Sequence, residues 1–553
     1  MSSPVRNTAH FNRPPATLPL EDVFDFHLEQ NPKRVAMVHP SRDGKNIKAY
    51  TFEEVVPAFH RAGHYINEAL SISEDPSARQ ASSVVAIIIK TDTMSYMTAI
   101  GGILRAGLTP FPISPRFSPT VISHLLRESQ PLGVITNDDV TKNLVNKILD
   151  EQAEEYTRRP VLCTLPNISM FYPGHNMHTP LQKHERKPND ISMLLHSSST
   201  SSIFPKLIPW SSATVTNHAD IEDEPSNRLP ELVLGAFGVE VFHSYGMVMF
   251  LVMVRRGLVL AVMDPKEKTS VFPVDSNDIY RCFLTVQPDI LVSSARVIES
   301  WANDDEKVDQ FRQSSVRLLY GGQPLNKAVG DNLVLNGVKV CTAYGSTEGG
   351  PVVIYPHFQG EDWQYWAISP RPGLNFVPRD DGLWEIFLVQ DAVTYLPYTN
   401  TIWNGQPAYS PGDLFVLHPI KPHTYKFFGR TSDQIMLATG EFINPAPIEE
   451  EIISGAPTVS MAVMFGHYRP RAGVIVQPKE ANKDDSSEDF LENVWSIIQN
   501  INTKLPAYSH ITREMIIITE PNKPISLSPK GLPRRSVAIV QYQNEIDSLY
   551  TRI

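Results

Sequence analysis

Residues 196–206 (HSSSTSSIFPK) combine a dense set of hydroxyl groups with a lysine at the end. Hydroxyls and backbone N–H groups donate hydrogen bonds, and the lysine adds a positive charge, which together suit a polyphosphate. The segment lacks the GxxxxGK[ST] pattern of a Walker A loop, and a solvated, flexible loop is the alternative interpretation. The candidate phosphate contacts are His196, Ser197, Ser198, Ser199, Thr200 and Lys206.

Residues 343–350 (AYGSTEGG) bring an aromatic ring, glycines, hydroxyls and a carboxylate into one short stretch. Tyr344 could stack on a purine, and Gly345 lets the backbone approach a ligand closely. Thr347 could bond a phosphate oxygen, and Glu348 offers Mg²⁺ the oxygen ligand that it prefers. A glycine turn with a surface glutamate is an equally good interpretation of this stretch alone.

Three further places carry groups of chemical interest. Gly321 and Gly322 follow the strand-like run VRLLY, where an open α/β sheet usually presents its ligand crevice, although a plain turn explains them equally well. Asp413 (in YSPGD) and Arg430 could exchange hydrogen bonds with a ribose diol, or each could stand in a surface turn. Lys530 (in SPKGLPRR) is catalytic only if the C-terminal tail folds back over the main domain.

Alternating strands and helices are expected to position these segments. Residues 20–30 have the apolar spacing of a first helix, and residues 83–90 (SVVAIIIK) form a β-branched run typical of a buried parallel strand. A helix-like stretch through residue 106 follows that strand. Similar alternation around residues 133–137, 289–293 and 316–320 predicts an α/β fold with helices covering the sheets.

From about residue 425 the pattern changes, and the turn-rich GRTSDQ leads into a shorter tail with its own strands and helices. We expect a large N-terminal domain over residues 1–430 and a small α+β C-terminal domain over residues 431–553. With 553 residues, the chain is long enough for two such units.

Composition excludes several classes of function. The net charge is -11 without a dense Lys/Arg tract, so neither nucleic acid nor an anionic membrane is an expected partner. The three cysteines are widely separated, which argues against a disulfide framework or a zinc site. No signal-peptide core or membrane-length apolar run occurs, so we expect a cytoplasmic protein that acts on a small molecule.

Taken in order, these segments resemble the core motifs of the adenylate-forming superfamily, which comprises adenylation domains, acyl- and aryl-CoA ligases and luciferases. The sequences of these motifs are most similar to those of two groups of adenylation domains. One group belongs to fungal enzymes of secondary metabolism that resemble non-ribosomal peptide synthetases, and the other belongs to carboxylic acid reductases. Three stretches carry this similarity, residues 106–119 (AGLTPFPISPRFSP), 320–325 (YGGQPL) and 439–452 (TGEFINPAPIEEEI). The resemblance implies an N-terminal adenylation core and a mobile C-terminal lid.

The resemblance also implies roles for individual residues. Residues 196–206 correspond to the phosphate loop, Tyr344 to the aromatic that stacks on adenine, Thr347 to the α-phosphate contact and Glu348 to the Mg²⁺ ligand. Asp413 and Arg430 correspond to the ribose contacts. Lys530 corresponds to a catalytic lysine that bridges the substrate carboxylate and the ATP phosphates. His243, in VFHSYGM, corresponds to a catalytic position beside the acyl pocket, whose other expected residues are Gly322 and Ala343. The remaining expected ATP or AMP contacts are Gly321, Gly322, Gln323, Thr342, Ala343, Gly345 and Ser346.

Two departures from the family pattern stand out. Ser199 and Ser202 occupy places where the phosphate loop normally has glycines, and one extra residue, which we assign to Ile203, precedes Pro205. At the hinge, the place of a common acidic residue is taken by Ser432, with Asp433 following.

The implied reaction is attack of a substrate carboxylate on the α-phosphorus of MgATP, giving an acyl-AMP and pyrophosphate. The acyl group would pass to the phosphopantetheine thiol of a carrier domain in a longer parent protein, or to CoA. Amino-acid-activating members of the superfamily keep an aspartate near this segment to hold the substrate's ammonium group, and VFHSYGM has no carboxylate, so the resemblance implies an acid without an α-amine. The resemblance favours an aryl acid such as a benzoic acid derivative, while an aryl-pyruvate or a short aliphatic acid would also fit.

Two other functions remain open from the sequence. A free-standing aryl- or acyl-CoA ligase shares the first half-reaction. A degenerate nucleotide-binding interaction protein would be consistent with the glycine-poor phosphate loop.

Overall fold

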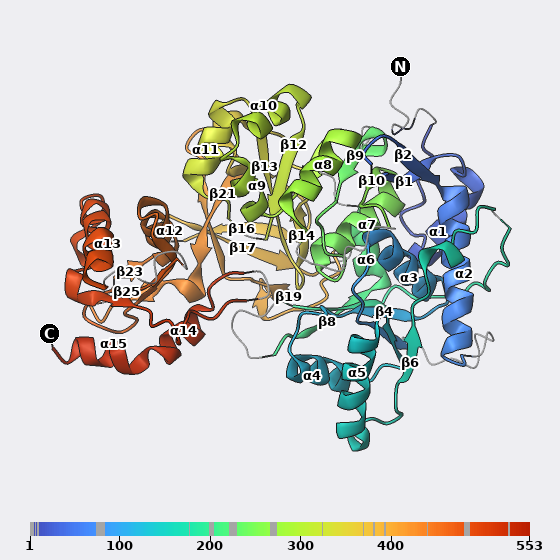
Figure 1. Cartoon of the computed structure of the whole chain (residues 1–553), viewed down its shortest axis with the longest axis horizontal. Coiled ribbons are helices and arrows are strands. Elements are labelled where there is room, and N and C mark those ends of the chain that lie inside the picture. Colours follow the sequence, from blue (N-terminus) through green and yellow to red (C-terminus); the bar gives the residue numbers. More distant parts are fainter. Residues whose placement is uncertain are drawn as a thin grey trace.

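The N-terminal part of the chain is built on a large, mainly parallel sheet, as a computed structural model shows (Figure 1). The structure describes residues 5, 7, 10–41, 43–72, 83–175, 177–197, 204–220, 229–265, 274–322, 324–368, 370–379, 382–391, 394–439, 441–479, 487–528 and 531–552. The strand order is β14-β13-β12-β11-β9-β10-β1-β2. These strands are β1 (Val35–Pro40), β2 (Ile47–Thr51), β9 (Val233–Gly235), β10 (Val259–Ala261), β11 (Ile290–Val292), β12 (Arg317–Gly321), β13 (Lys339–Ser346) and β14 (Gly350–Val353).

The pairing of this sheet determines where its ligand edge lies. Six neighbouring strands of this sheet pair in parallel, namely β13, β12, β11, β9, β10 and β1. The two edge strands, β2 and β14, pair antiparallel to their neighbours. Parallel strands end at the same edge of a sheet, so the ends of β12 and β13 meet there. Gly321 is accordingly in register with Ala343.

A second parallel sheet, with the order β4-β3-β5-β6, lies beside the first, together with the antiparallel hairpin β7–β8. The strand expected within residues 83–90 is confirmed as β3. The bounds are β3 (Val84–Ile87), β4 (Thr109–Pro112), β5 (Gly133–Thr136), β6 (Val161–Thr164), β7 (Ile191–His196) and β8 (Leu207–Ser211).

Helices cover both sheets, and the most deeply buried is α3, all of whose residues are buried. It can pack closely on α2 because both helices carry glycine at the crossing. A Cβ on Gly102 would lie 2.6 Å from the Cβ of Ala62. The helices of this part are α1 (Leu20–Gln30), α2 (Phe52–Ala69), α3 (Thr93–Arg105), α4 (Pro119–Ser129), α5 (Asp139–Glu151), α6 (Ser212–Ala219), α7 (Ser244–Arg256), α8 (Ser276–Val286), α9 (Ala295–Trp301), α10 (Asp305–Ser314) and α11 (Lys327–Leu335).

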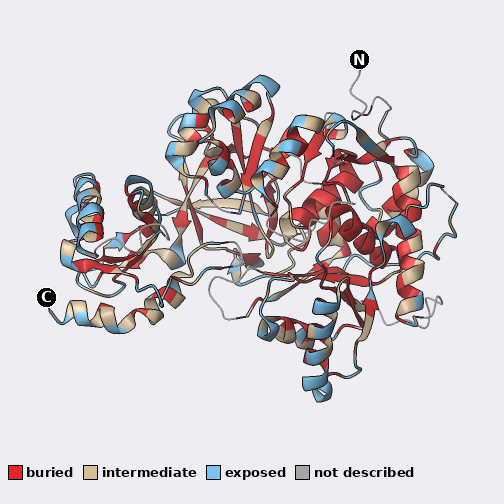
Figure 2. Cartoon of the chain, viewed as in Figure 1, coloured by how far each residue is buried: buried red, intermediate tan, exposed pale blue. Residues whose placement is uncertain are grey.

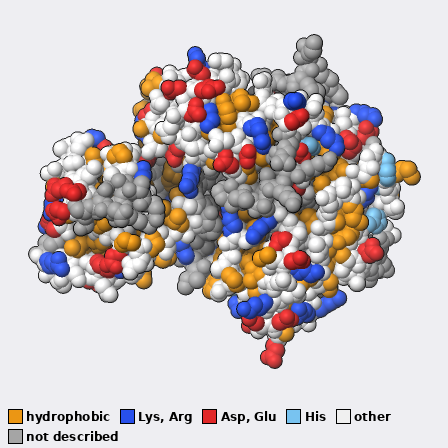
Figure 3. Space-filling model, in the orientation of Figure 1, with side chains coloured by type: hydrophobic (Ala, Val, Ile, Leu, Met, Phe, Trp, Pro, Cys, Tyr) orange, Lys and Arg blue, Asp and Glu red, His pale blue; other side chains and the backbone are white. Residues whose placement is uncertain are grey.

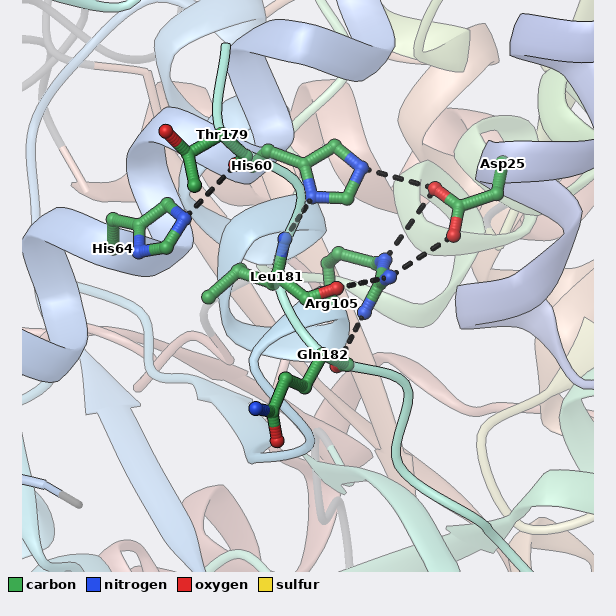
Figure 4. A network of polar contacts seen from close by, with 7 residues as sticks. All are labelled: Asp25, His60, His64, Arg105, Thr179, Leu181 and Gln182. Atoms are coloured by element: carbon green, nitrogen blue, oxygen red, sulfur yellow. Dashed lines mark hydrogen bonds and ion pairs between the residues drawn. The ribbon is translucent and has the colours of Figure 1, made fainter. Parts of the chain in front are cut away.

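A polar network joins α1, α2 and α3 to the segment that precedes β7 (Figure 4). The two oxygens of Asp25 accept hydrogen bonds from His60 Nε2 (2.9 Å) and Arg105 Nη2 (2.9 Å). His60 Nδ1 accepts a hydrogen bond from the backbone N–H of Leu181 (3.0 Å). The imidazole is therefore neutral, and burial lowers its pKa despite the nearby carboxylate. Because both ring nitrogens are occupied, His60 holds structure together and does not act as a general base.

An antiparallel sheet of seven strands follows, with the order β15-β21-β20-β17-β19-β18 and β16 paired to β17. Its aromatic side chains pack together, as in the stacked pair of Phe376 and Tyr425. The bounds are β15 (Tyr365–Ala367), β16 (Leu374–Pro378), β17 (Trp384–Val389), β18 (Thr401–Trp403), β19 (Gln406–Tyr409), β20 (Asp413–Leu417) and β21 (Thr424–Arg430).

The C-terminal part has its own hydrophobic core, whose members all come from residues after Arg430 (Figure 2). Helices and the three-stranded sheet β24-β25-β26 surround this core. The expected fold class, an α/β protein with a small α+β C-terminal part, is confirmed, and the boundary after residue 430 stays a prediction. The elements are β22 (Ile435–Met436), β23 (Phe442–Ile443), α12 (Pro445–Gly455), β24 (Val459–Phe465), β25 (Gly473–Pro478), α13 (Ser487–Asn502), β26 (Ile516–Ile518), α14 (Arg535–Gln541) and α15 (Gln543–Tyr550).

The C-terminal part touches the rest of the molecule through specific polar contacts. Asn444 Nδ2 donates to the carbonyl of Phe428 (2.8 Å), and the backbone N–H of Lys327, at the start of α11, donates to Glu450 Oε1 (2.8 Å).

None of the helices in the described ranges combines the length and apolar character that crossing a membrane requires. On the face shown in Figure 3, basic and acidic side chains are interspersed.

Candidate functional site

The loop between β13 and β14 carries Thr347, which two distant elements hold in place. Trp210, on β8, donates its indole N–H to the Thr347 carbonyl (3.0 Å). Ser244, the first residue of α7, places its hydroxyl 3.0 Å from that of Thr347. The candidate phosphate contact is therefore fixed through both its backbone and its side chain.

Glycines in this hairpin are required by packing. Gly350 has φ of +76°, and a Cβ there would lie within 2.5 Å of Cδ2 and Cε1 of the buried His218 ring. A Cβ on Gly345 would lie 2.8 Å from the carbonyl oxygen of Gly350. The hairpin thus needs these glycines, because close packing leaves no room for a side chain at either position.

Glu348, in the same loop, is half-buried, and its negative charge contributes to raising the pKa of Tyr409, which burial raises most. Ser346 Oγ accepts the backbone N–H of Gly349 and so shapes the loop around Glu348 (2.9 Å). No ion pair within the described part of the chain involves Glu348. A carboxylate beside a candidate phosphate contact fits a hard cation such as Mg²⁺. Among the described residues, no three His, Cys, Asp or Glu side chains gather as a metal site, so nucleotide oxygens would have to supply other ligands.

Asp413 and Arg430 are brought together by the register of β20 and β21. Arg430 Nε donates to Asp413 Oδ1 (2.8 Å), and the Tyr344 hydroxyl donates to Asp413 Oδ2 (2.6 Å). Burial raises the pKa of Asp413, and Arg430 and the Tyr344 hydrogen bond oppose that shift. The charge of Asp413 raises the pKa of Arg430. A carboxylate has about four acceptor positions, so Asp413 keeps capacity for a ribose hydroxyl.

The Tyr344 ring lies among aromatic side chains. Its centroid is 5.3 Å from that of Trp366 and 5.2 Å from that of Phe415. Trp366 also donates its indole N–H to the carbonyl of Thr342 (2.6 Å). This packing orients the ring that we expect to stack on adenine.

Ser197 and Lys206 close the neck of the hydroxyl-rich segment. The Ser197 backbone N–H donates to the Lys206 carbonyl (3.0 Å), and the Lys206 N–H donates to the Ser197 hydroxyl (3.1 Å). Lys206 Nζ also bonds the Tyr398 hydroxyl (3.3 Å) and lies 5.0 Å from that ring's centroid. The lysine charge is thereby held at the neck. Five expected site residues lie outside the described residues, namely Ser198, Ser199, Thr200, Gln323 and Lys530.

His243 precedes α7 and belongs to a charged cluster. Its Nε2 is 3.2 Å from Glu240 Oε2, which also accepts a hydrogen bond from Arg116 Nη2 (2.6 Å). Burial alone raises the pKa of Glu240, but His243 and Arg116 outweigh it, so the pKa is lowered. The ring of His196 lies 6.2 Å from that of His243. Burial lowers the pKa of His196 to about 3, and the nearby His243 makes a smaller contribution in the same direction. His196 is therefore neutral.

The candidate residues at the sheet edge lie together. Gly321 faces Ala343 across the strand pair, and Gly322 follows with φ of +76°. A Cβ on Gly321 would lie 3.3 Å from the Cβ of Ala343 and 3.7 Å from Cζ of Tyr245, on the first turn of α7. The edge predicted to hold the acid therefore adjoins the helix that begins beside His243.

Backbone hydrogen bonds join described residues on either side of Lys530, and others lie at the expected hinge. Gly531, with φ of +77°, donates its N–H to the Ser528 carbonyl (2.8 Å), and the Ser528 N–H donates to Leu532 (2.8 Å). At the hinge, Thr431 donates its N–H to the Gly412 carbonyl (2.8 Å). Ser432 is exposed and Asp433 is half-buried.

Several residues of the site escaped the sequence analysis. Ser244 directly follows His243, and this adjacency was a usable signal. Trp210, Glu240 and Tyr398 contact residues that are far away in the sequence, and no local pattern predicts such contacts. Arg116 lies within a stretch singled out only by resemblance.

Comparison with known proteins places the chain. Residues 24–376 match the AMP-binding enzyme family, and residues 432–553 match the AMP-binding enzyme C-terminal domain. The adenylate-forming reductase Nps10 of Heterobasidion annosum is 29% identical over 557 residues, which cover 98% of this chain and 51% of the relative. The carboxylic acid reductase of Neurospora crassa is 24% identical, covering 94% and 49%, respectively. The chain thus spans about half the length of these curated relatives.

Solved structures share the fold. The adenylation domain of the carboxylic acid reductase from Segniliparus rugosus, in complex with AMP and a co-purified carboxylic acid, superposes with a TM-score of 0.67 at 15% identity, covering 97% of this chain and 95% of that one. ATP-bound MatB from Rhodopseudomonas palustris gives a TM-score of 0.69 at 15% identity, covering 96% and 100%. The chain therefore belongs to the AMP-binding enzyme family, which confirms the expected class of an adenylate-forming ligase.

Proposed function

We propose that this protein uses ATP to activate a carboxylic acid, specifically an aryl acid such as a benzoic acid derivative, as its acyl-AMP. The supporting observation is that the start of α7 connects the residue expected beside the acid, His243, with the residue expected to bind the α-phosphate, Thr347. His243 and Ser244 are neighbours, and the Ser244 hydroxyl lies 3.0 Å from that of Thr347. A carboxylate held near His243 would then lie next to the α-phosphate held by Thr347.

In the proposed reaction, a carboxylate oxygen attacks the α-phosphorus and pyrophosphate leaves. The protein provides no nucleophile, so its contribution is to position two anions and neutralise charge. Thr347 and the neck formed by Ser197 and Lys206 bind phosphate oxygens, and Asp413 and Arg430 hold the ribose. Mg²⁺, held by Glu348 together with the nucleotide, would offset the phosphate charge. Lys530 would neutralise charge between the carboxylate and the phosphates.

We further propose that the acceptor of the acyl group is the phosphopantetheine thiol of a carrier domain. The proposal is supported by the reductases among the relatives, of which this chain spans only half. Rotation of the C-terminal domain about Ser432 and Asp433 would bring the thiol to the acyl-AMP. The cytoplasm is the proposed location.

The test is acid-dependent exchange of pyrophosphate into ATP across a panel of aryl and aliphatic acids. Exchange with aryl acids is the expected result. Exchange restricted to aliphatic acids would overturn the aryl assignment, and ATP binding without any exchange would indicate a nucleotide-binding protein that has lost catalysis. Supplying CoA or a phosphopantetheinylated carrier to the active enzyme then identifies the acceptor, and thioester formation with CoA alone would indicate a CoA ligase.

Lys530→Ala isolates the role of the C-terminal lysine. We expect exchange to fall about 10²–10³-fold, the usual loss for one charge-stabilising donor, while ATP binding stays largely intact. Lys530→Arg keeps the charge and serves as the control. Undiminished exchange in the alanine variant would remove this residue from the mechanism.

A further inference from the structure

Tyr398 links the neck formed by Ser197 and Lys206 to the antiparallel sheet. Its hydroxyl lies 3.3 Å from Lys206 Nζ, and the same ammonium group lies 5.0 Å from the centroid of the Tyr398 ring. Lysine has a flexible side chain with three N–H donors, so a hydroxyl that accepts one of them leaves the others for a ligand. Tyr398 therefore restricts the lysine without using all of its hydrogen-bonding capacity.

The segment that carries Tyr398 is held on both sides. Before it, the Tyr395 carbonyl accepts a hydrogen bond from the Thr214 hydroxyl on α6 (3.3 Å). After it, Asn400 Nδ2 donates to the Ser410 carbonyl (2.8 Å), and the Ser410 N–H donates back to Asn400 Oδ1 (2.9 Å). The tyrosine is thus a fixed support for a flexible lysine.

The Tyr398 ring is half-buried and packs against both the main hydrophobic cluster of the N-terminal part and the cluster of the antiparallel sheet. Its centroid lies 6.0 Å from that of Tyr409. Tyr409 in turn lies against the loop that carries Glu348, since a Cβ on Gly349 would be 2.8 Å from Cδ1 of the Tyr409 ring. The two rings therefore connect the lysine with the loop of the candidate Mg²⁺ ligand.

The spacing along β8 places Lys206 and Thr347 at different phosphates. Lys206 directly precedes β8, whereas Trp210, near the other end of that strand, bonds the Thr347 carbonyl. The stretch of strand from Lys206 to Trp210 spans about 13 Å, which is more than one phosphate group covers. With Thr347 at the α-phosphate, Lys206 is placed for the outer phosphates, which leave as pyrophosphate.

We propose that Tyr398 is a positioning residue that holds the Lys206 ammonium group where it meets the outer phosphates of ATP. This inference rests on the proposed function, because it takes the neck to receive the ATP phosphates. Tyr398 touches no substrate in this role and acts only through the lysine. It therefore contributes to the binding of ATP and contributes nothing to the binding of AMP, which lacks those phosphates.

The test measures the Kd of ATP and of AMP by isothermal titration calorimetry in the wild type, Tyr398→Phe and Tyr398→Leu. Tyr398→Phe loses the hydroxyl but keeps the ring beside the lysine, so the Kd for ATP should rise about 2–13-fold, the contribution of one hydrogen bond. Tyr398→Leu also loses the ring, which should raise the Kd for ATP about 2–5-fold more. The Kd for AMP should stay unchanged in both variants.

Two further proteins show whether Tyr398 acts through the lysine. Tyr365→Leu is the matched control, because Lys426 Nζ lies 5.1 Å from the centroid of the Tyr365 ring in the same antiparallel sheet, outside the candidate site. This variant should bind ATP as the wild type does. Adding Tyr398→Leu to Lys206→Ala should not weaken ATP binding beyond the loss in Lys206→Ala alone, because residues that act as a unit are not additive.

Three results would overturn the inference: an unchanged Kd for ATP in Tyr398→Leu, equal losses of ATP and AMP binding, or a further loss when Tyr398→Leu is added to Lys206→Ala. The titrations need neither an acid nor turnover. If the wild type binds ATP but shows no exchange with any acid, the proposed reaction fails, and the titrations still decide the role of Tyr398.

Discussion

Replacing Gly350 by alanine tests whether the β13–β14 hairpin is fixed by close packing. The left-handed backbone at φ of +76° costs a non-glycine residue about 1–2 kcal/mol. The added Cβ would also lie within 2.5 Å of two carbons of the His218 ring, and such overpacking typically costs about 1–3 kcal/mol. Gly350→Ala should therefore destabilise the protein by about 2–5 kcal/mol.

Gly405→Ala is the matched control. Gly405 has φ of +79°, but an added Cβ there would meet no atom within 4 Å. It should lose only the backbone contribution, about 1–2 kcal/mol. Urea denaturation followed by tryptophan fluorescence measures both variants, since the Trp210 ring lies 4.6 Å from that of His218.

The same pair of variants separates stability from function. Because Gly350 closes the loop that carries Thr347 and Glu348, Gly350→Ala should raise the KM for ATP, and Gly405→Ala should not. Adding His218→Ala to Gly350→Ala removes the colliding ring and should recover part of the lost stability beyond additivity. Equal destabilisation by the two glycine variants would refute the packing argument.

Three further predictions follow from the described contacts. Ser244→Ala removes the hydroxyl partner of Thr347 and should lower kcat/KM for ATP by about 2–13-fold, whereas Ser244→Thr should retain most of it; equal kinetics in all three proteins would contradict the contact. Asp413→Asn weakens the contact with Arg430, whose side chain is 40% exposed, and should cost about 1–3 kcal/mol in denaturation while raising the KM for ATP; an unaltered KM would exclude the ribose role. Stability should fall as the pH drops below 6.5, because buried histidines whose pKa is lowered stay neutral when folded but take up protons when unfolded. Each of these histidines contributes up to about 1.4 kcal/mol per pH unit to the slope of the unfolding free energy against pH, down to its pKa in the folded protein. An unfolding free energy that stays constant between pH 7 and 5 in urea titrations would contradict this prediction. The histidines concerned, with their pKa values, are His27 (about 4), His196 (about 3) and His218 (about 3).

Local patterns predicted the elements well and the contacts between them poorly. The run of β-branched residues at β3 and the apolar spacing of α1 are properties of consecutive residues, so the sequence reveals them. From their own segments, Asp413 and Arg430 could be ribose contacts or could stand in separate surface turns, because the ion pair between them depends on the register of two antiparallel strands. Trp210 reaches Thr347 across 137 positions, a relation that only the folded chain creates.

Helix boundaries illustrate the same limit. Residues 536–550 have the apolar spacing of one amphipathic segment, whereas the structure divides this part of the chain into α14 and α15 at Tyr542. The Tyr542 ring is buried, and its hydroxyl bonds the carbonyl of Lys523. A contact with a residue 19 positions away therefore accompanies the break, and helical periodicity cannot register it.

Arg430 is the last residue of β21, and the short turn of Thr431–Asp433 begins at the next residue. The guanidinium that pairs with Asp413 therefore belongs to a residue directly beside the expected hinge about which the C-terminal lobe would rotate. Torsion applied there would reach the Asp413–Arg430 ion pair, the proposed ribose contact, through a single peptide bond. Release of the nucleotide and reorientation of the C-terminal lobe would consequently be coupled directly through the backbone, without a chain of side-chain contacts between them.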